Sequence, residues 1–241
     1  MTRCDLSLGF VGLGALGLPM AINLHRAGFP LRVHTRSRSA ETSAGLEGAI
    51  RCSSPADAST GVDVLLLCVS DDAAVEDVLF GPNGAASQLS DGSVVLDCST
   101  IAPATAQRCG ERLAGQNVHY LDAPVTGGTE GAKRGSLTVL VGGASELLER
   151  VQPILEVIGG SIHHFGGVGR GQQVKAVNQV LVAGSYAAVA EAVALGQQLD
   201  LPMPQVIDAL KTGAAGSWAL MLVHPDGVVT ATKRVRVVSS N

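Results

Sequence analysis

Short apolar runs alternate with helical segments over the first 165 residues, and this alternation constrains the fold most. The predicted strands are rich in valine and leucine and span residues 6–12, 31–35, 62–70, 93–100, 119–125 and 136–142. The predicted helices between them span residues 18–28, 73–81, 104–116 and 145–159. Continuous apolar runs are typical of strands that are covered on both faces, as in a parallel sheet. The sequence therefore predicts an α/β fold with a Rossmann-type, doubly wound sheet.

The alternation stops at a glycine-rich segment, residues 165–171, and helical patterns follow over residues 171–200 and 201–213. We therefore expect two domains, a Rossmann domain over residues 1–165 and an all-α domain over residues 166–241. Residues 180–196 approach the hydropathy of a membrane span, but they are rich in alanine and include Ser185, Tyr186 and Glu191. This composition predicts a buried helix and no membrane partner.

Composition excludes several classes of protein. The chain is 46% hydrophobic and 16% charged, which is typical of a globular protein. A net charge of −4 gives no indication of a nucleic-acid partner, and the basic cluster Lys233, Arg234 and Arg236 is interpreted as a solvated tail. The five cysteines form no C-x-x-C pair, and the N-terminus shows no secretory signal. We expect reduced thiols, a cytoplasmic location and no metal site.

Gly12-x-Gly14-x-x-Gly17 lies where the first predicted strand turns into the first predicted helix. Gly12 would allow the tight turn, Gly14 would let a pyrophosphate approach the backbone, and Gly17 would let the helix pack against the strand. The helix N-terminus would then direct N–H groups at the phosphates. A structural glycine turn is the alternative, but the flanking strand and helix favour a dinucleotide site.

The end of the second predicted strand bears on which dinucleotide binds. An NAD site usually has an acidic residue here, yet residues 33–39 contain none and the first acid is Glu41. Arg36, Ser37 and Arg38 instead suit the 2′-phosphate of NADP. NADP is the predicted cofactor, with NAD as the second choice; an exposed basic loop is the alternative interpretation.

Motifs in a fixed order resemble the β-hydroxyacid dehydrogenases, the family of 3-hydroxyisobutyrate dehydrogenase and tartronate semialdehyde reductase. The matching stretches are residues 9–28, with Leu16 where methionine is usual, 121–128, with Thr126 in place of serine, 131–143 and 174–179. The resemblance implies that Lys175 is the catalytic lysine and that Thr100 contacts the cofactor. The predicted cofactor-binding residues are Gly12, Leu13, Gly14, Leu16, Gly17, Thr35, Arg36, Ser37, Val69 and Thr100.

The chemistry of such a reaction fits these residues. Oxidation of a hydroxy acid requires an acid–base group and a holder for the carboxylate, while the cofactor takes the hydride. Lys175 and Asn178 are spaced i, i+3 and lie on one helical face. Thr126, Gly127 and Gly128 follow a strand end, where ligands bind in open α/β sheets. The alternative for Lys175 is a snorkelling lysine at a helix start, and the alternative for Thr126 is a simple turn residue.

The resemblance to the family is expected to end after residues 213–220. Members of the family continue with further helices and a Lys-Asp-Leu motif, whereas residues 221–241 show no helical periodicity. This departure predicts an incomplete helical domain, a poorly ordered tail, and a second domain that is unstable or associates through its long helix. Full-length relatives are expected to be homo-oligomers.

Three functions remain open at this point. The first is an NAD(P)-dependent oxidoreductase that interconverts a small β-hydroxy acid and its semialdehyde. The second is a non-catalytic nucleotide-binding or interaction protein, and the third is an imine reductase-like enzyme. Lys175 weighs against the third, because imine reductases typically have another residue at this position. The 6-phosphogluconate enzymes have a much larger helical domain and are disfavoured.

Overall fold

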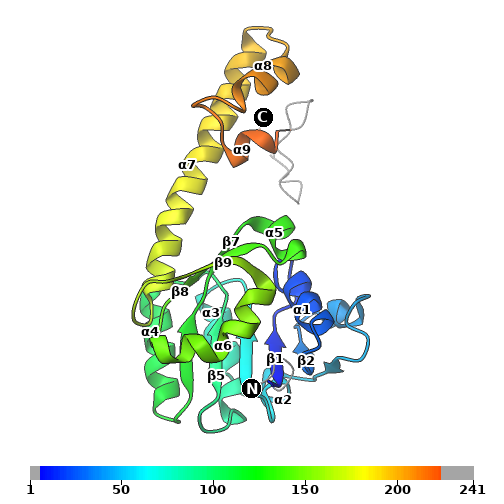
Figure 1. The fold of residues 1–241 in the computed structure, drawn as a ribbon, viewed down its shortest axis with the longest axis vertical. Helices are drawn as coiled ribbons and strands as arrows, with labels where there is room; N and C mark the ends of the chain where they lie inside the picture. The colour runs from blue at the N-terminus through cyan, green and yellow to red at the C-terminus, as the bar shows by residue number, and fades with distance from the viewer. Residues whose placement is uncertain (1–5, 224–241) are drawn as a thin grey trace, which may run out of the picture. The chain divides into compact units, whose positions relative to one another are not determined.

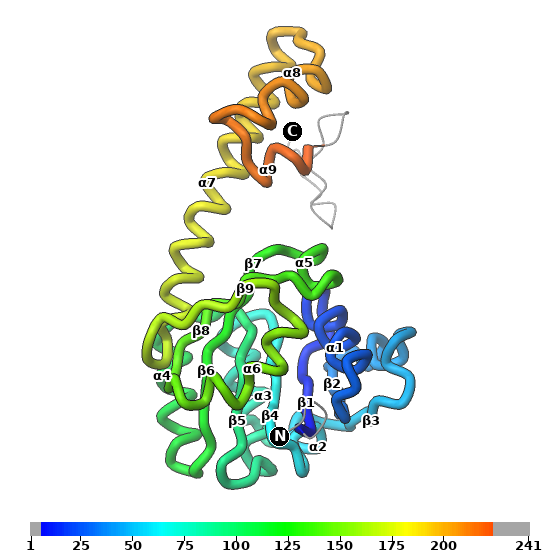
Figure 2. The backbone as a smooth tube through the Cα atoms, viewed as in Figure 1, coloured from blue at the N-terminus to red at the C-terminus, as the bar shows by residue number. Residues whose placement is uncertain are grey.

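A computed structural model describes residues 6–223, and its first unit is built on a parallel sheet of six strands (Figure 1). Figure 2 follows the chain through this sheet, whose strand order is β3-β2-β1-β4-β5-β6. The strands are β1 (Leu8–Val11), β2 (Leu31–His34), β3 (Ile50–Arg51), β4 (Val64–Leu67), β5 (Val94–Asp97) and β6 (His119–Asp122). All five neighbouring pairs are parallel. The chain order reverses between β1 and β4, which is the switch point where open α/β sheets bind ligands.

Helices cover both faces of this sheet, and each face has its own apolar core. These helices are α1 (Gly17–Arg26), α2 (Pro55–Ser59), α3 (Asp72–Phe80), α4 (Pro103–Ala114), α5 (Gly128–Arg134) and α6 (Ser145–Ile158). On one face Phe10 packs with buried residues of α1 and α6, including Met20 and Ile154. On the other face Leu65 packs with buried residues of α2, α3 and α4. The predicted doubly wound α/β fold is confirmed.

A second, smaller sheet lies beside the first and was only partly predicted. It contains β7 (Val125–Thr126), β8 (Leu137–Val141) and β9 (Gly159–His164). β7 pairs with β8 antiparallel, and β8 pairs with β9 parallel. The predicted strand over residues 119–125 is thus two strands, because the chain leaves the parallel sheet at Asp122 and pairs there with Gly142. A two-residue strand such as β7 has too short a pattern to be predicted from periodicity.

The second compact unit begins after Lys175, within the first turns of α7 (Arg170–Gln198). Among its described residues it also contains α8 (Met203–Leu210) and α9 (Trp218–Met221). Its small core joins the later part of α7 to α9. The core consists of Val189, Val193, Ala219, Leu220 and Val223.

The prediction of a buried helix over residues 180–196 is wrong for this unit. Val180 is 72% exposed and Leu181 is 69% exposed. The reason is that the described core of this unit is small and joins α7 only to α8 and α9, which leaves much of this part of the helix exposed. By length and composition α7 could also cross a membrane, a test that core helices of globular proteins pass as well. The basic cluster and the tail predicted over residues 221–241 lie outside the described residues from position 224 onward.

Candidate functional site

The glycine motif lies in the turn between β1 and α1, and each glycine has a distinct environment. Gly12 has a φ of +101°, a conformation that side chains rarely adopt. A Cβ at Gly17 would collide with the carbonyl oxygen of Gly12, so only glycine lets α1 begin this close to β1. A Cβ at Gly14 would meet no atom within 4 Å. The backbone at Gly14 is therefore not covered by protein atoms on the side from which a ligand would approach it.

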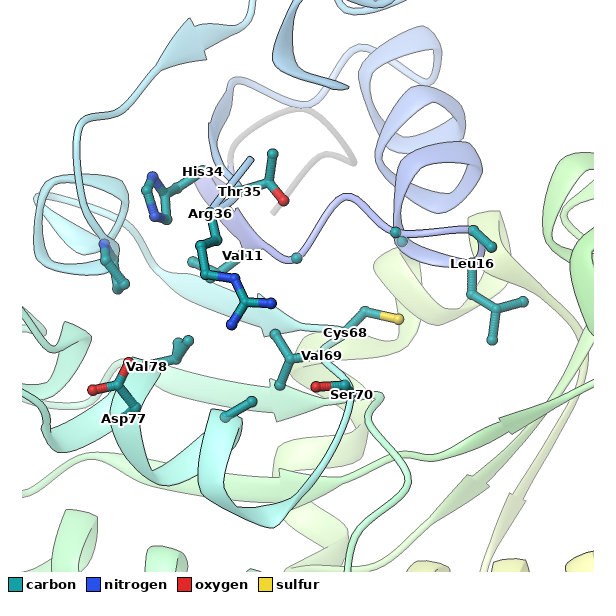
Figure 3. A pocket seen from close by; sticks show the side chains of 16 residues that line it. Val11, Leu16, His34, Thr35, Arg36, Cys68, Val69, Ser70, Asp77 and Val78 are labelled. Carbon is teal, nitrogen blue, oxygen red and sulfur yellow. The ribbon is translucent and has the colours of Figure 1, made fainter. Parts of the chain in front are cut away.

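A pocket opens beside this turn, at the carboxyl ends of β1, β2 and β4 (Figure 3). Its wall includes seven of the predicted cofactor residues, namely Gly12, Gly14, Leu16, Gly17, Thr35, Arg36 and Val69. Leu13, Ser37 and Thr100 do not line it; Leu13 is instead part of the core. The position at the switch point and the bare glycine turn fit a dinucleotide.

Several lining residues were missed from the sequence. They are Val11, Ala15, His34, Pro55, Cys68, Ser70, Ala74, Asp77 and Val78. Val11 and His34, which end β1 and β2, and Cys68 and Ser70, which follow β4, could have been found from their place at strand ends. Pro55, Asp77 and Val78 could not, because their approach depends on how α2 and α3 pack in three dimensions.

The two arginines after β2 have different surroundings. Arg36 lines the pocket, and in Figure 3 its side chain extends toward the wall formed by Val69 and Ser70. Arg38 adopts a φ of +62° and is held by protein groups. Its Nε lies 3.1 Å from Oε2 of Glu41, and its NH1 donates to the carbonyl oxygen of Cys52 at 2.8 Å. Of the two, only Arg36 is placed for a ligand in this pocket.

Glu41 stabilises the loop after β2 through contacts to Thr35 and Arg38. Its side chain is 2% exposed, and Oε1 accepts a hydrogen bond from the backbone N–H of Thr35 at 2.9 Å. The same carboxylate pairs with Arg38. Glu41, the first acidic residue after β2 in the sequence, is thus committed to loop structure.

Lys175 lies in a second cluster, at the start of α7. The residue is 8% exposed, and Nζ donates a hydrogen bond to the carbonyl oxygen of Val125 at 2.8 Å. Burial lowers the pKa of Lys175 below its usual value. Val125 directly precedes Thr126, Gly127 and Gly128, so the predicted lysine and the predicted substrate-binding turn are adjacent in space. Lys175 is too buried to be a simple surface lysine, whereas Gly127 in the turn is exposed and Thr126 and Gly128 are half-buried.

The turn after Val125 requires its two glycines. Gly127 has a φ of +125° and Gly128 a φ of +64°, and α5 begins at Gly128.

Two further predicted site residues lie elsewhere. Asn178 lies on α7 in the second unit, and its Nδ2 donates to Oε1 of Gln179 at 3.0 Å. Thr100 follows β5 and is exposed.

Two family models match the chain in succession. The NAD-binding domain of 6-phosphogluconate dehydrogenase matches residues 7–167. The NAD-binding domain of NADP-dependent 3-hydroxyisobutyrate dehydrogenase matches residues 169–236. The chain belongs to the 3-hydroxyisobutyrate dehydrogenase family. Because the second match runs to residue 236, the resemblance does not end at residue 220 as expected.

Individual relatives of the family agree with this assignment. The chain is 37% identical over 227 residues to 2-hydroxy-3-oxopropionate reductase of Escherichia coli, covering 94% of this chain and 77% of that protein. The structure of 3-hydroxyisobutyrate dehydrogenase from Salmonella typhimurium superposes with a TM-score of 0.83 at 33% identity, covering 89% of this chain and 75% of the other. Psf3 in complex with NADP+ and 2-OPP has a TM-score of 0.84 at 29% identity, covering 92% and 80%.

Membership of the family makes the chain an NAD(P)-binding oxidoreductase, which confirms the predicted family and cofactor class. The pocket residues fit this cofactor, since the bare Gly14 backbone suits a pyrophosphate and Arg36 suits a 2′-phosphate.

Cysteines and metal ligands form no further site within residues 6–223. No group of three or more His, Cys, Asp or Glu residues there could hold a metal ion. Cys52, Cys68, Cys98 and Cys109 are free thiols. Burial raises the pKa of Cys68, which lines the pocket, to about 12. Its thiol is therefore protonated and a poor nucleophile at neutral pH.

Proposed function

We propose that the chain interconverts a small β-hydroxy acid and its semialdehyde, with NADP as the preferred cofactor and NAD as the second choice. The single observation that carries this proposal is the buried amine of Lys175, held 2.8 Å from the Val125 carbonyl oxygen beside the Thr126–Gly128 turn. Bound NADP supplies the acceptor or donor of the hydride. The reactions named for the relatives, a 3-hydroxyisobutyrate dehydrogenase and a 2-hydroxy-3-oxopropionate reductase, support this class of substrate.

Lys175 is the proposed general acid and base. In the oxidative direction its neutral amine takes the proton of the substrate hydroxyl, while the hydride leaves the carbon that bears this hydroxyl. In the reductive direction its ammonium donates a proton to the alkoxide oxygen that develops when hydride reaches the carbonyl carbon. Burial favours the neutral amine, so both protonation states become accessible closer to neutral pH.

The Thr126–Gly128 turn is the proposed carboxylate holder. A threonine hydroxyl and backbone N–H groups are suitable donors to a carboxylate. Asn178, one helical turn after Lys175 on α7, is a further proposed substrate ligand. Arg36 is the proposed ligand of the 2′-phosphate, and Leu13, Ser37 and Thr100 remain proposed cofactor contacts outside the pocket wall. We also place the enzyme in the cytoplasm, where its free cysteines would stay reduced.

A panel of carbonyl substrates tests this proposal. Purified protein is mixed with NADPH or NADH and with three-carbon and four-carbon semialdehydes that carry a carboxylate. Matched aldehydes without the carboxylate, and a cyclic imine, serve as comparison substrates. We expect turnover only of the carboxylate-bearing aldehydes, faster with NADPH.

Other outcomes would replace the proposal. Turnover of the imine alone would make the chain an imine reductase-like enzyme. NADPH binding without any turnover would leave a non-catalytic nucleotide-binding protein.

A further inference from the structure

Gln172 connects the helix that carries Lys175 to the strand end that carries Thr100. Gln172 is 1% exposed, and both the nitrogen and the oxygen of its side-chain amide make hydrogen bonds. Nε2 donates to the carbonyl oxygen of Ser99 at 2.8 Å, and Oε1 accepts from the backbone N–H of Ile101 at 3.2 Å. The amide thus forms hydrogen bonds to the backbone on both sides of Thr100.

Ser99 extends this connection to the cofactor pocket. Its hydroxyl oxygen accepts a hydrogen bond from the backbone N–H of Val69 at 3.0 Å, and Val69 lines the pocket. Its own N–H donates to Oδ1 of the buried Asp97 at 2.9 Å. Hydrogen bonds therefore run from the pocket wall through Ser99 to Gln172.

Asp122 fixes the other side of the same helical turn. Its Oδ1 accepts from the backbone N–H of Gly169 at 2.7 Å, and its Oδ2 accepts from the backbone N–H of Gln172 at 2.8 Å. A carboxylate at a helix N-terminus satisfies N–H groups that have no partner within the helix. A Cβ at Gly171 would collide with the carbonyl oxygen of Leu140, so α7 begins pressed against the end of β8.

Lys175 follows Gln172 by three residues, so the two side chains lie on one face of the first turns of α7. We propose that Gln172 is a positioning residue that fixes Lys175 relative to the cofactor pocket. This inference rests on the proposed role of Lys175 as acid and base. Gln172 itself is not proposed to contact the reacting atoms. Its role is to set the distance between Lys175 and the cofactor pocket.

Gln172→Met tests the proposal, because methionine has a similar length and cannot make either amide hydrogen bond. Gln173→Met is the matched control, since Gln173 is the exposed neighbour and its side-chain Oε1 accepts a hydrogen bond from Arg170 within the same turn. For each protein we would measure kcat, KM and the NADPH dissociation constant. The pH dependence of acylation of Lys175, followed by peptide mass spectrometry, would report the position of its amine without turnover.

We expect Gln172→Met to lower kcat by roughly 10-fold to 100-fold, since small misplacements of reacting groups have effects of this size. The NADPH dissociation constant should stay within about twofold, because no pocket-lining residue is removed. Lys175 should lose part of its burial, so that its acylation requires a higher pH than in the native protein. A purely structural role would lower the melting temperature and leave kcat and the acylation profile unchanged.

Native kcat in folded Gln172→Met, or a loss accounted for by weaker NADPH binding, would overturn the proposal. If the native protein turns over none of the substrates, the proposed function fails, and the acylation profile alone decides: a shift supports positioning and no shift overturns it. If Gln172→Met does not fold, Gln172→Asn is measured in the same way, because its shorter amide cannot span Ser99 and Ile101.

Discussion

Nζ of Lys175 donates a hydrogen bond to the backbone carbonyl oxygen of Val125 over 2.8 Å. An ammonium group has three N–H donors, so this bond orients the group and leaves two donors for other partners. Since Val125 is followed at once by Thr126, the oriented amine lies beside the turn proposed to hold the substrate. The proposed acid–base group and the proposed substrate holder therefore lie in one local structure.

The pH dependence of the two reaction directions should have opposite signs. In the proposed mechanism reduction needs the ammonium form of Lys175, so the rate of reduction should fall as pH rises through the pKa of Lys175. Oxidation needs the neutral amine, so its rate should fall as pH decreases through the same pKa. Because burial lowers the pKa of Lys175 from 10.5, both transitions should lie below that pH. Initial rates in both directions across pH would check this; profiles of the same sign would contradict it.

Gly14 and Gly17 should respond differently to alanine. In Gly14→Ala the new methyl group enters open space in the pocket wall, so the melting temperature should be unchanged while NADPH binds about tenfold more weakly. In Gly17→Ala the methyl group meets the Gly12 carbonyl oxygen, and overpacking should cost about 1–3 kcal/mol of stability. Thermal unfolding of the apo proteins and NADPH titration measure the two effects. Equal losses of stability would show that Gly14 also has a packing role.

Arg36 and Arg38 should contribute unequally to cofactor choice. A charge-assisted hydrogen bond to phosphate contributes about 1.5–3 kcal/mol, so Arg36→Asp should weaken NADPH binding about 10-fold to 100-fold and favour NADH. Arg38→Ala should leave the ratio of the two affinities nearly unchanged, because Glu41 and Cys52 hold its guanidinium. Fluorescence titration of both cofactors gives the ratios. A larger effect at Arg38 would move the phosphate contact to that residue.

Much of the first unit follows from sequence pattern. Continuous apolar runs predict the parallel strands because those strands are covered on both faces, and the roles of Gly12 and Gly17 follow from the turn that they must form. The pairing of Arg38 with Glu41 does not follow, because it depends on a left-handed residue inside the loop. Gln172 and Asp122 were also missed, since their partners lie at strand ends that are distant in sequence.

The second unit should be cut first in limited proteolysis. Five residues form its described core, whereas the sheet of the first unit has an extensive apolar core on each face. A segment with few buried contacts opens locally at low cost in free energy. Dilute protease should therefore cleave within residues 176–223 and leave a resistant fragment that ends near the start of α7, as mass spectrometry would show. A full-length chain that resists the same treatment would show that the second unit is well packed.

Transfer of deuterium from NADPH that carries deuterium at both C4 positions to a carboxylate-bearing semialdehyde tests the central claim most directly. Mass spectrometry of the product should find one deuterium on the carbinol carbon with the native protein. Lys175→Ala should still bind NADPH, but its rate of labelling should fall about 10²-fold to 10⁴-fold, since general acid–base groups contribute effects of this size. Lys133→Ala is the matched control, because that lysine is exposed and pairs with Glu130. An unlabelled product, or native labelling rates in Lys175→Ala, would contradict hydride transfer with Lys175 as the acid and base.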